Sequence, residues 1–177
     1  ESLSTANDDI KSSRQLSLSA YLHKNNVPSF HHHYLMVDRE QYFNPASTVK
    51  MPVAFLALEK LNQIKVAGVD KNTPMLTDSN YSAQTSAQND FSAENKLPSV
   101  GHYIRKIFLV SDNAAYNRLY EFVGQKTINE RLWQMGYKDV RITRRFVKAT
   151  DEENRHTNPI RFVDAKNKLS FFVSIHV

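Results

Sequence analysis

The fold is decided by the stretch Asn44-Pro45-Ala46-Ser47-Thr48-Val49-Lys50-Met51-Pro52, which opens the clearest helical pattern in the chain. Behind it, apolar residues recur three and four positions apart, the spacing of one face of an α-helix: Val53, Leu56, Ala57, Leu61 and Ile64. Proline is tolerated in the first turn of a helix, and Gly68 lies just past the expected end. The pattern predicts a helix that opens at Ser47 and runs to about Lys65.

Ser47 and Lys50 are three residues apart, so on this helix their side chains lie on one face, one turn apart. A serine hydroxyl is a weak nucleophile until a neighbouring base takes its proton. A lysine amine is such a base when burial or a nearby cation lowers its pKa. The alternative is structural, because serine at a helix start also caps free backbone N–H groups. Both interpretations stay open on this motif alone.

The composition is that of an ordinary globular protein: 177 residues, 41% hydrophobic and 23% charged. We expect one domain, and no apolar run is long enough to cross a membrane. The absence of cysteine excludes disulfides, thiolate metal sites and cysteine nucleophiles. The chain starts at Glu1 without a charged and apolar leader, so a signal peptide was either removed or never existed.

The net charge is +5, and basic residues are dense between Lys138 and Lys168. They include Arg141, Arg144, Arg145, Lys148, Arg155 and Arg161. No nucleic-acid-binding module accompanies them, so we expect a solvated face or an anion-attracting cleft and no nucleic-acid partner. The run His31-His32-His33 does not predict a metal site, because alternating side chains of a strand cannot all converge on one ion.

The rest of the chain predicts strand elements at both ends around a helical middle. Expected helices cover Ser2–Asn26, Leu97–Val110, a segment from Ser111 to Gly124, and a segment that begins with the capping-box pair Thr127 and Glu130 and ends at Gly136. Expected strands or extended pieces are His31–Val37, Val140–Ile142, Ile160–Val163 and Leu169–Val177. The segment Asp70–Lys96 is polar and is expected to be a long surface loop with short helical pieces.

A second motif, Ser111-Asp112-Asn113, stands at the break between two predicted helices. All three residue types are preferred helix caps, so a capping role is its structural interpretation. Its position after the Ser-x-x-Lys helix points instead to a cleft where the two motifs meet.

Together the two motifs resemble the class A serine β-lactamases and the related penicillin-recognising peptidases. The resemblance is strongest over 44–66 and 108–136, where Leu109-Val110-Ser111-Asp112-Asn113-Ala114-Ala115-Tyr116-Asn117-Arg118-Leu119 and Met135-Gly136-Tyr137 are similar to family segments. It implies an α/β (α+β) fold of the β-lactamase/transpeptidase-like type, an antiparallel sheet flanked by helices. In that fold, 47–150 is a mostly helical subdomain, and 1–46 and 151–177 form the α/β part.

The resemblance also implies roles for individual residues. Ser47 is acylated, Lys50 is the base or proton relay, Ser111 passes a proton to the leaving nitrogen, and Asn113 holds the substrate's amide. The backbone amide of Ser47 is one oxyanion donor. No cofactor or metal is implied, and an exported, periplasmic or secreted bacterial protein is expected.

Three departures from the family pattern bear on activity. Lys-Thr-Gly on a late strand is absent, and Lys166-Asn167-Lys168 is the nearest lysine-rich turn before a strand. The family's deacylating base lies in a Glu-x-x-Leu-Asn segment, and the corresponding region here is Asp151-Glu152-Glu153-Asn154. Glu152 and Glu153 are therefore candidates for that base, or they belong to an exposed acidic turn. The chain is also shorter than a complete family domain, so we expect that C-terminal or internal sequence is missing.

The sequence thus predicts a serine hydrolase that cleaves a β-lactam or a related amide or ester through an acyl-enzyme on Ser47. A penicillin-binding D-alanyl peptidase or transpeptidase, acting on a peptidoglycan-like substrate, is the first alternative. A non-catalytic binding protein on the same fold is the second, favoured by the missing Lys-Thr-Gly.

Overall fold

The computed structural model describes residues 16–24, 27–35, 37–38, 40–164 and 169–173, and the chain divides into two compact units, 1–46 and 47–177. The first unit contains an antiparallel hairpin, β1 (Leu16–Lys24) and β2 (Val27–Leu35), with a register that runs from Leu16↔Leu35 to Lys24↔Val27. The strand predicted from His31 is confirmed as far as Leu35 and begins earlier, at Val27.

The helix predicted over Ser2–Asn26 is wrong for 16–24, and its earlier residues lie outside the described ones. The reason is a period of two: the small and apolar residues Leu16, Leu18, Ala20 and Leu22 alternate with Ser17, Ser19, Tyr21 and His23. A period of two is typical of a strand, whereas apolar residues of a helix recur three and four positions apart. In the hairpin register, Pro28 is opposite His23.

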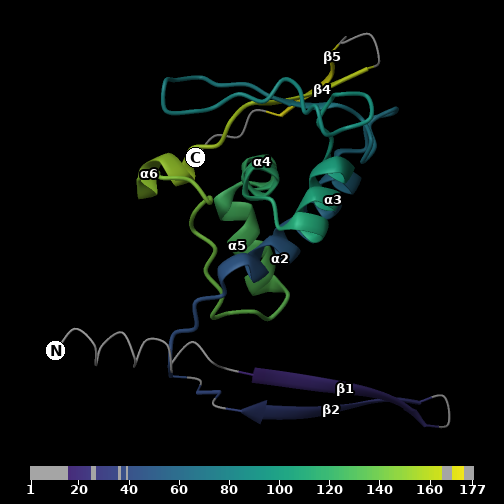
Figure 1. Ribbon diagram of the computed structural model, residues 1–177, viewed down its shortest axis with the longest axis vertical. Coiled ribbons are helices and arrows are strands. Elements are labelled where there is room, and N and C mark those ends of the chain that lie inside the picture. Colours follow the sequence, from purple (N-terminus) through teal and green to yellow (C-terminus); the bar gives the residue numbers. More distant parts are fainter. Residues whose placement is uncertain (1–15, 25–26, 36, 39, 165–168, 174–177) are drawn as a thin grey trace. The chain divides into compact units, whose positions relative to one another are not determined.

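The second unit holds five described α-helices and a three-stranded antiparallel sheet (Figure 1). The helices are α2 (Lys50–Ile64), α3 (Val100–Val110), α4 (Asn113–Val123), α5 (Gln125–Gln134) and the short α6 (Asp151–Arg155), preceded by a 3-10 turn, η1 (Ala46–Val49). The sheet has the order β3 (Met75–Thr77), β4 (Ile160–Val163) and β5 (Leu169–Val173). The helices predicted from Ser47, Leu97 and Ser111 are confirmed as α2, α3 and α4, each of which begins two or three residues later than expected. The strand Ile160–Val163 is confirmed, and the strand predicted over Leu169–Val177 is confirmed as far as Val173, since 174–177 lie outside the described residues.

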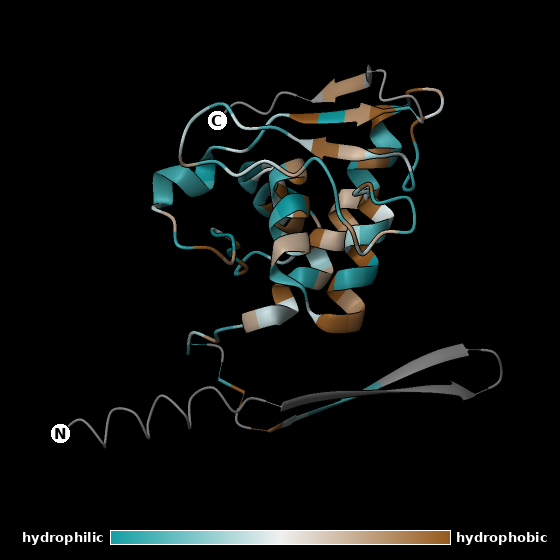
Figure 2. Ribbon diagram, turned by 45° about the horizontal axis from the view of Figure 1, so that its top comes forward, coloured by the Kyte–Doolittle hydropathy of each residue, from teal (hydrophilic) through white to brown (hydrophobic). Residues whose placement is uncertain are grey.

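The core of the second unit lies between the sheet and α4, around which α2, α3 and α5 pack. Apolar residues dominate β3 and β4, and the helices lie on one side of the sheet (Figure 2). Phe122 of α4 meets Phe162 of β4 edge to face, with ring centroids 5.6 Å apart, and both side chains are fully buried. Aromatic contacts of this kind add to the burial of apolar area that stabilises the unit.

Local capping explains where the helices begin. Ser99 accepts a hydrogen bond from the His102 N–H at 3.1 Å, and Asp112 accepts one from the Ala115 N–H at 2.8 Å. The predicted capping box at Thr127 is wrong, because α5 begins two residues earlier, at Gln125. The same spacing forms a real capping box at Thr150 and Glu153, ahead of α6.

Two irregular segments also differ from expectation. Residues 70–96 hold no helix in the structure but contain β3, whose three residues are all buried; a strand this short leaves no periodic signal. The segment around Ile142 is not a strand. The Ile142 backbone N–H donates to Asn129 Oδ1, and the Ile142 carbonyl accepts from Asn129 Nδ2, both at 2.8 Å.

Several of the basic residues between 138 and 168 have partners of their own. Arg145 pairs with Glu121, Arg155 with Glu152 and Arg161 with Asp78, while Arg141 lies over the Trp133 ring. The absence of a nucleic-acid partner stays a prediction. Among the described residues, no helix has both the length and the apolar character of a membrane span, and no cluster of three His, Cys, Asp or Glu side chains is arranged to hold a metal ion.

Candidate active site

Ser47 lies exposed in η1, in the turn that leads into α2. The N-cap position of α2 is Val49, and it has no side-chain capping bond. An Asx turn precedes η1, in which Asn44 Oδ1 accepts a hydrogen bond from the Ala46 N–H at 3.1 Å. Ser47 is therefore not at the N-cap of α2, and its hydroxyl stands at the surface one turn before Lys50.

Lys50 is the first residue of α2, and only 2% of its surface is exposed. Its Nζ donates to Ser111 Oγ at 2.9 Å, to Asn113 Oδ1 at 2.6 Å and to the Ser111 backbone carbonyl. These three acceptors match the three donors of an ammonium group. The structure thus brings Lys50 together with Ser111 and Asn113, which are more than sixty positions away in the chain.

The acceptors of Lys50 lie where the chain passes from α3 to α4, and the backbone conformation there positions them. Ser111 is the C-cap of α3, with a positive φ of 53°, and its N–H bonds to the Ile107 carbonyl. Few non-glycine residues adopt this left-handed conformation, which reverses the chain before α4 starts. Asp112 then caps α4, so the capping role predicted as the alternative for the motif belongs to its middle residue.

Burial is the main influence on the protonation of Lys50. It lowers the pKa of the Lys50 amine, while the carboxylate of Asp112 raises it, and the net direction is downward. Desolvation acts this way because it disfavours the charged form. A larger fraction of the Lys50 amine is therefore neutral in this site than would be neutral in water at the same pH.

Phe146 completes the surroundings of Lys50. Lys50 Nζ lies 4.9 Å from the centroid of the Phe146 ring, which in turn packs on Tyr116 with centroids 4.9 Å apart. Phe146 follows no helical or strand pattern, so the sequence carried no signal that it reaches the site.

The two candidate deacylation bases, Glu152 and Glu153, both make contacts within or next to α6. Glu153 closes its capping box, with Oε2 accepting from the Thr150 N–H at 2.6 Å and from the Thr150 hydroxyl at 3.0 Å. The Glu152 side chain is 64% exposed and pairs with Arg155 at 2.8 Å. Lys166-Asn167-Lys168 lies outside the described residues.

A buried ion-pair network behind the site was not predicted. Glu121 of α4 is 1% exposed and pairs with Arg145 at 2.8 Å and with Arg118 at 3.2 Å. Arg145 also donates to the Glu153 carbonyl at 2.7 Å, and its backbone N–H donates to Asn154 Oδ1. The network anchors the segment that carries Phe146 against α4.

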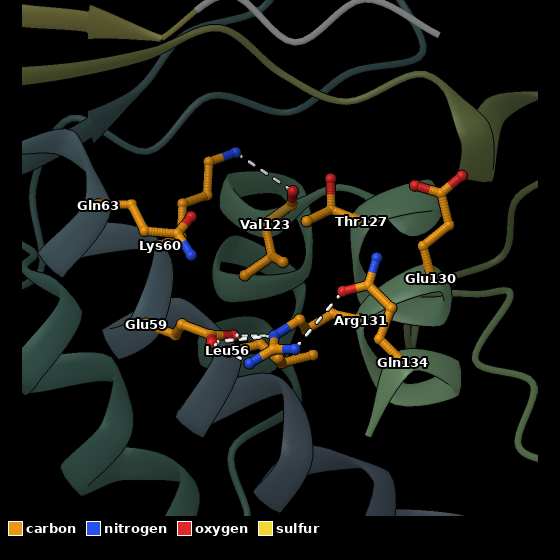
Figure 3. A pocket seen from close by; sticks show the side chains of 9 residues that line it. All are labelled: Leu56, Glu59, Lys60, Gln63, Val123, Thr127, Glu130, Arg131 and Gln134. Carbon is orange, nitrogen blue, oxygen red and sulfur yellow. Dashed lines mark hydrogen bonds and ion pairs between the residues drawn. The ribbon is translucent and has the colours of Figure 1, made fainter. Parts of the chain in front are cut away.

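A shallow surface pocket lies elsewhere, between α2 and α5 (Figure 3). Its lining includes the bidentate pair of Glu59 and Arg131, and Lys60, whose Nζ donates to the Phe122 and Val123 carbonyls at the end of α4. Ser47, Lys50, Ser111 and Asn113 are not among its lining residues. The pocket is therefore distinct from the candidate active site, and Lys60 acts there as a cap for α4.

Lys60 gives a prediction about stability. Burial lowers its pKa from 10.5 to about 8, so between these values the unfolded chain binds more protons than the folded one. Stability therefore rises as pH increases through this range, by an amount on the order of 2 kcal/mol. Urea unfolding at pH 7.5, 9 and 10 checks it against Lys60→Met, which is expected to lack this rise. Parallel pH curves for the two proteins would contradict the assignment.

The class of protein follows from fold and comparison together. The helices and the small antiparallel sheet make a mixed α/β structure of the β-lactamase-like fold. A model of the β-lactamase enzyme family matches residues 14–171, and the chain belongs to that family. Searches of curated proteins and of solved structures gave no significant match.

Proposed function

We propose that this chain is a β-lactamase-like serine hydrolase that forms an acyl-enzyme on Ser47. The proposal is carried by one observation: the buried amine of Lys50 bonds both Ser111 Oγ and Asn113 Oδ1. These contacts link Lys50 of the first motif to Ser111 and Asn113 of the second, and Ser47 lies three positions before Lys50 in the chain. Family membership supports hydrolase chemistry for it.

In its neutral form, the Lys50 amine has two N–H donors and one lone pair, so it keeps two of its three hydrogen bonds. In the first step, Ser47 Oγ attacks the substrate carbonyl while its proton passes to that lone pair. The new C–O bond forms, the C–N bond of the amide or β-lactam breaks, and Ser111 relays the proton to the leaving nitrogen. The Ser47 backbone N–H stabilises the oxyanion. Because Asn113 Oδ1 accepts from Lys50, its Nδ2 remains as the donor that holds the substrate's amide carbonyl.

The substrate we infer is a β-lactam or a related amide or ester, cleaved without a cofactor. A class A assignment and an exported, periplasmic or secreted location rest on the resemblance of the motifs and on the family. A single domain that spans both compact units is part of the same proposal.

A penicillin-binding peptidase is the second candidate, favoured by the positions of Glu152 and Glu153. Both carboxylates are engaged at α6, so neither is held ready to activate water. An acyl-enzyme formed in this site would then persist until an amine acceptor, such as a peptide of the peptidoglycan type, replaces water.

The proposed function is tested by incubating the protein with benzylpenicillin and measuring intact mass, followed by peptide mapping. We expect one adduct of the penicillin's mass on Ser47, its absence in Ser47→Ala, and its retention in Ser82→Ala, a change at an exposed loop serine. Turnover of a chromogenic cephalosporin supports the hydrolase, and a long-lived adduct supports the peptidase. A native protein that takes up no adduct contradicts both and favours the binding protein.

A further inference from the structure

An aromatic ring lies close to Lys50 Nζ, beside its three oxygen acceptors. Three hydrogen bonds occupy the donors of the ammonium group, and the half-buried Phe146 ring lies 4.9 Å away. Water approaching the amine from that direction would have to displace the ring. Phe146 therefore contributes directly to the desolvation of Lys50.

Phe146 is held in this position by its neighbours. Its backbone N–H donates to Asn117 Oδ1 at 2.7 Å, and its ring packs on Tyr116, whose hydroxyl donates to the Arg144 carbonyl at 3.0 Å. The adjacent Arg145 is fixed to Glu121 by the buried ion pair. Phe146 and the two residues before it are thus tied to α4, the helix that also carries Asn113.

We propose that Phe146 is a positioning residue for acylation: its ring keeps water from Lys50 so that the amine can accept the proton of Ser47. This inference rests on the proposed function for its catalytic meaning, although its effect on Lys50 can be measured independently. It also assigns a purpose to the buried Glu121–Arg145 pair, which places the ring.

Other charges near Lys50 have identifiable effects. Asp112, at the start of α4, raises the pKa of Lys50, and it is itself paired with Lys106 of α3 at 3.4 Å. On the segment that carries Phe146, Arg145 is neutralised by Glu121, and Arg144 is exposed. Changing Phe146 alters none of these charges, so a change in Lys50 titration would report the ring itself.

Two substitutions separate the effects of the ring. Phe146→Ala admits water and is expected to raise the pKa of Lys50 toward that of a solvated lysine. Phe146→Leu keeps the apolar cover but removes the attraction between cation and ring, so the pKa is expected to stay at or below the native value. Phe91→Ala is the matched control, because Phe91 is 78% exposed and distant in sequence from both motifs.

The experiment titrates the 13Cε signal of Lys50 by NMR in all four proteins, with Lys50→Arg to assign the signal. In parallel, the rate of penicillin adduct formation is measured from pH 5 to 9. The proposal is supported if Phe146→Ala is the only variant that raises the pKa of Lys50. The acid limb of its pH–rate profile for acylation must also move to higher pH by the same amount. An unchanged pKa in Phe146→Ala, or an equal change in Phe91→Ala, overturns it. Failure of native protein to form an adduct, with the NMR shift present, would refute the proposed function and leave the role of Phe146 in desolvation standing.

Discussion

Lys50→Met is expected to slow the acylation of Ser47 by about 10²- to 10⁴-fold, the usual contribution of a positioned base. Methionine has nearly the same length and fits an apolar environment, so the substitution removes the proton acceptor and leaves the volume filled. It also removes the donor shared by Ser111 and Asn113, which loosens the two residues assigned to the leaving group and the substrate amide. Quenched intact-mass measurements of adduct formation at pH 7.5 give the rate.

Lys126→Met is the matched control for this change. It removes the same charge from a side chain that is 82% exposed on α5, where its only partner among the described ion pairs is Glu130 at 3.9 Å. We expect its acylation rate to equal that of the native protein. A native-like rate in Lys50→Met, with the fold intact by circular dichroism, would show that another group takes the proton of Ser47.

Arg145→Met is expected to lower the free energy of unfolding by about 3 kcal/mol, because it leaves a buried carboxylate with one cation instead of two. Glu121 is 1% exposed, and burial raises its pKa despite the two arginines, so its charge depends on them. The substitution also removes the bond from Arg145 to the Glu153 carbonyl beside α6. Equilibrium unfolding in urea measures the loss.

The double variant Glu121→Met, Arg145→Met distinguishes a charge effect from a packing effect. The double variant leaves no uncompensated buried carboxylate, and Arg118 keeps its hydrogen bonds to the Thr85 carbonyl and hydroxyl. We therefore expect the double variant to recover most of the stability that Arg145→Met loses. If the double variant were no more stable than the single one, the lost contacts of Arg145, rather than the uncompensated charge of Glu121, would account for the effect.

The elements that could be predicted are those with a long periodic pattern or a clear cap. The helix behind Ser47 shows five apolar residues at helical spacing, and Ser99 and Gly124 mark the boundaries of α3 and α4. The first strand of the hairpin, β1, was mistaken for a helix, because its alternating pattern is mixed with serine and histidine. β3 escaped prediction because three residues are too few to establish a period.

Within the candidate site, local sequence was informative about residue types and helix ends. Ser47 and Lys50 share a turn whatever the tertiary fold, because helical geometry alone relates positions three apart. That Lys50 contacts Ser111 and Asn113 was expected from the resemblance of the two motifs and not from spacing. Phe146 and the Glu121–Arg145 pair had no local signal, since their roles depend on partners far away in the chain.

For this protein, the order of residues alone settled which segments become the α2, α3 and α4 helices, to within a few residues at their starts. Periodic burial and capping are local properties, and a single sequence expresses them directly. Tertiary packing alone decided that the Lys50 side chain is buried and that the Phe146 ring lies next to its amine. The structure also shows that Glu153 caps α6 and that Glu152 pairs with Arg155 within that helix. Desolvation and charge pairing depend on which distant segments come together, and so they arise only in the folded chain.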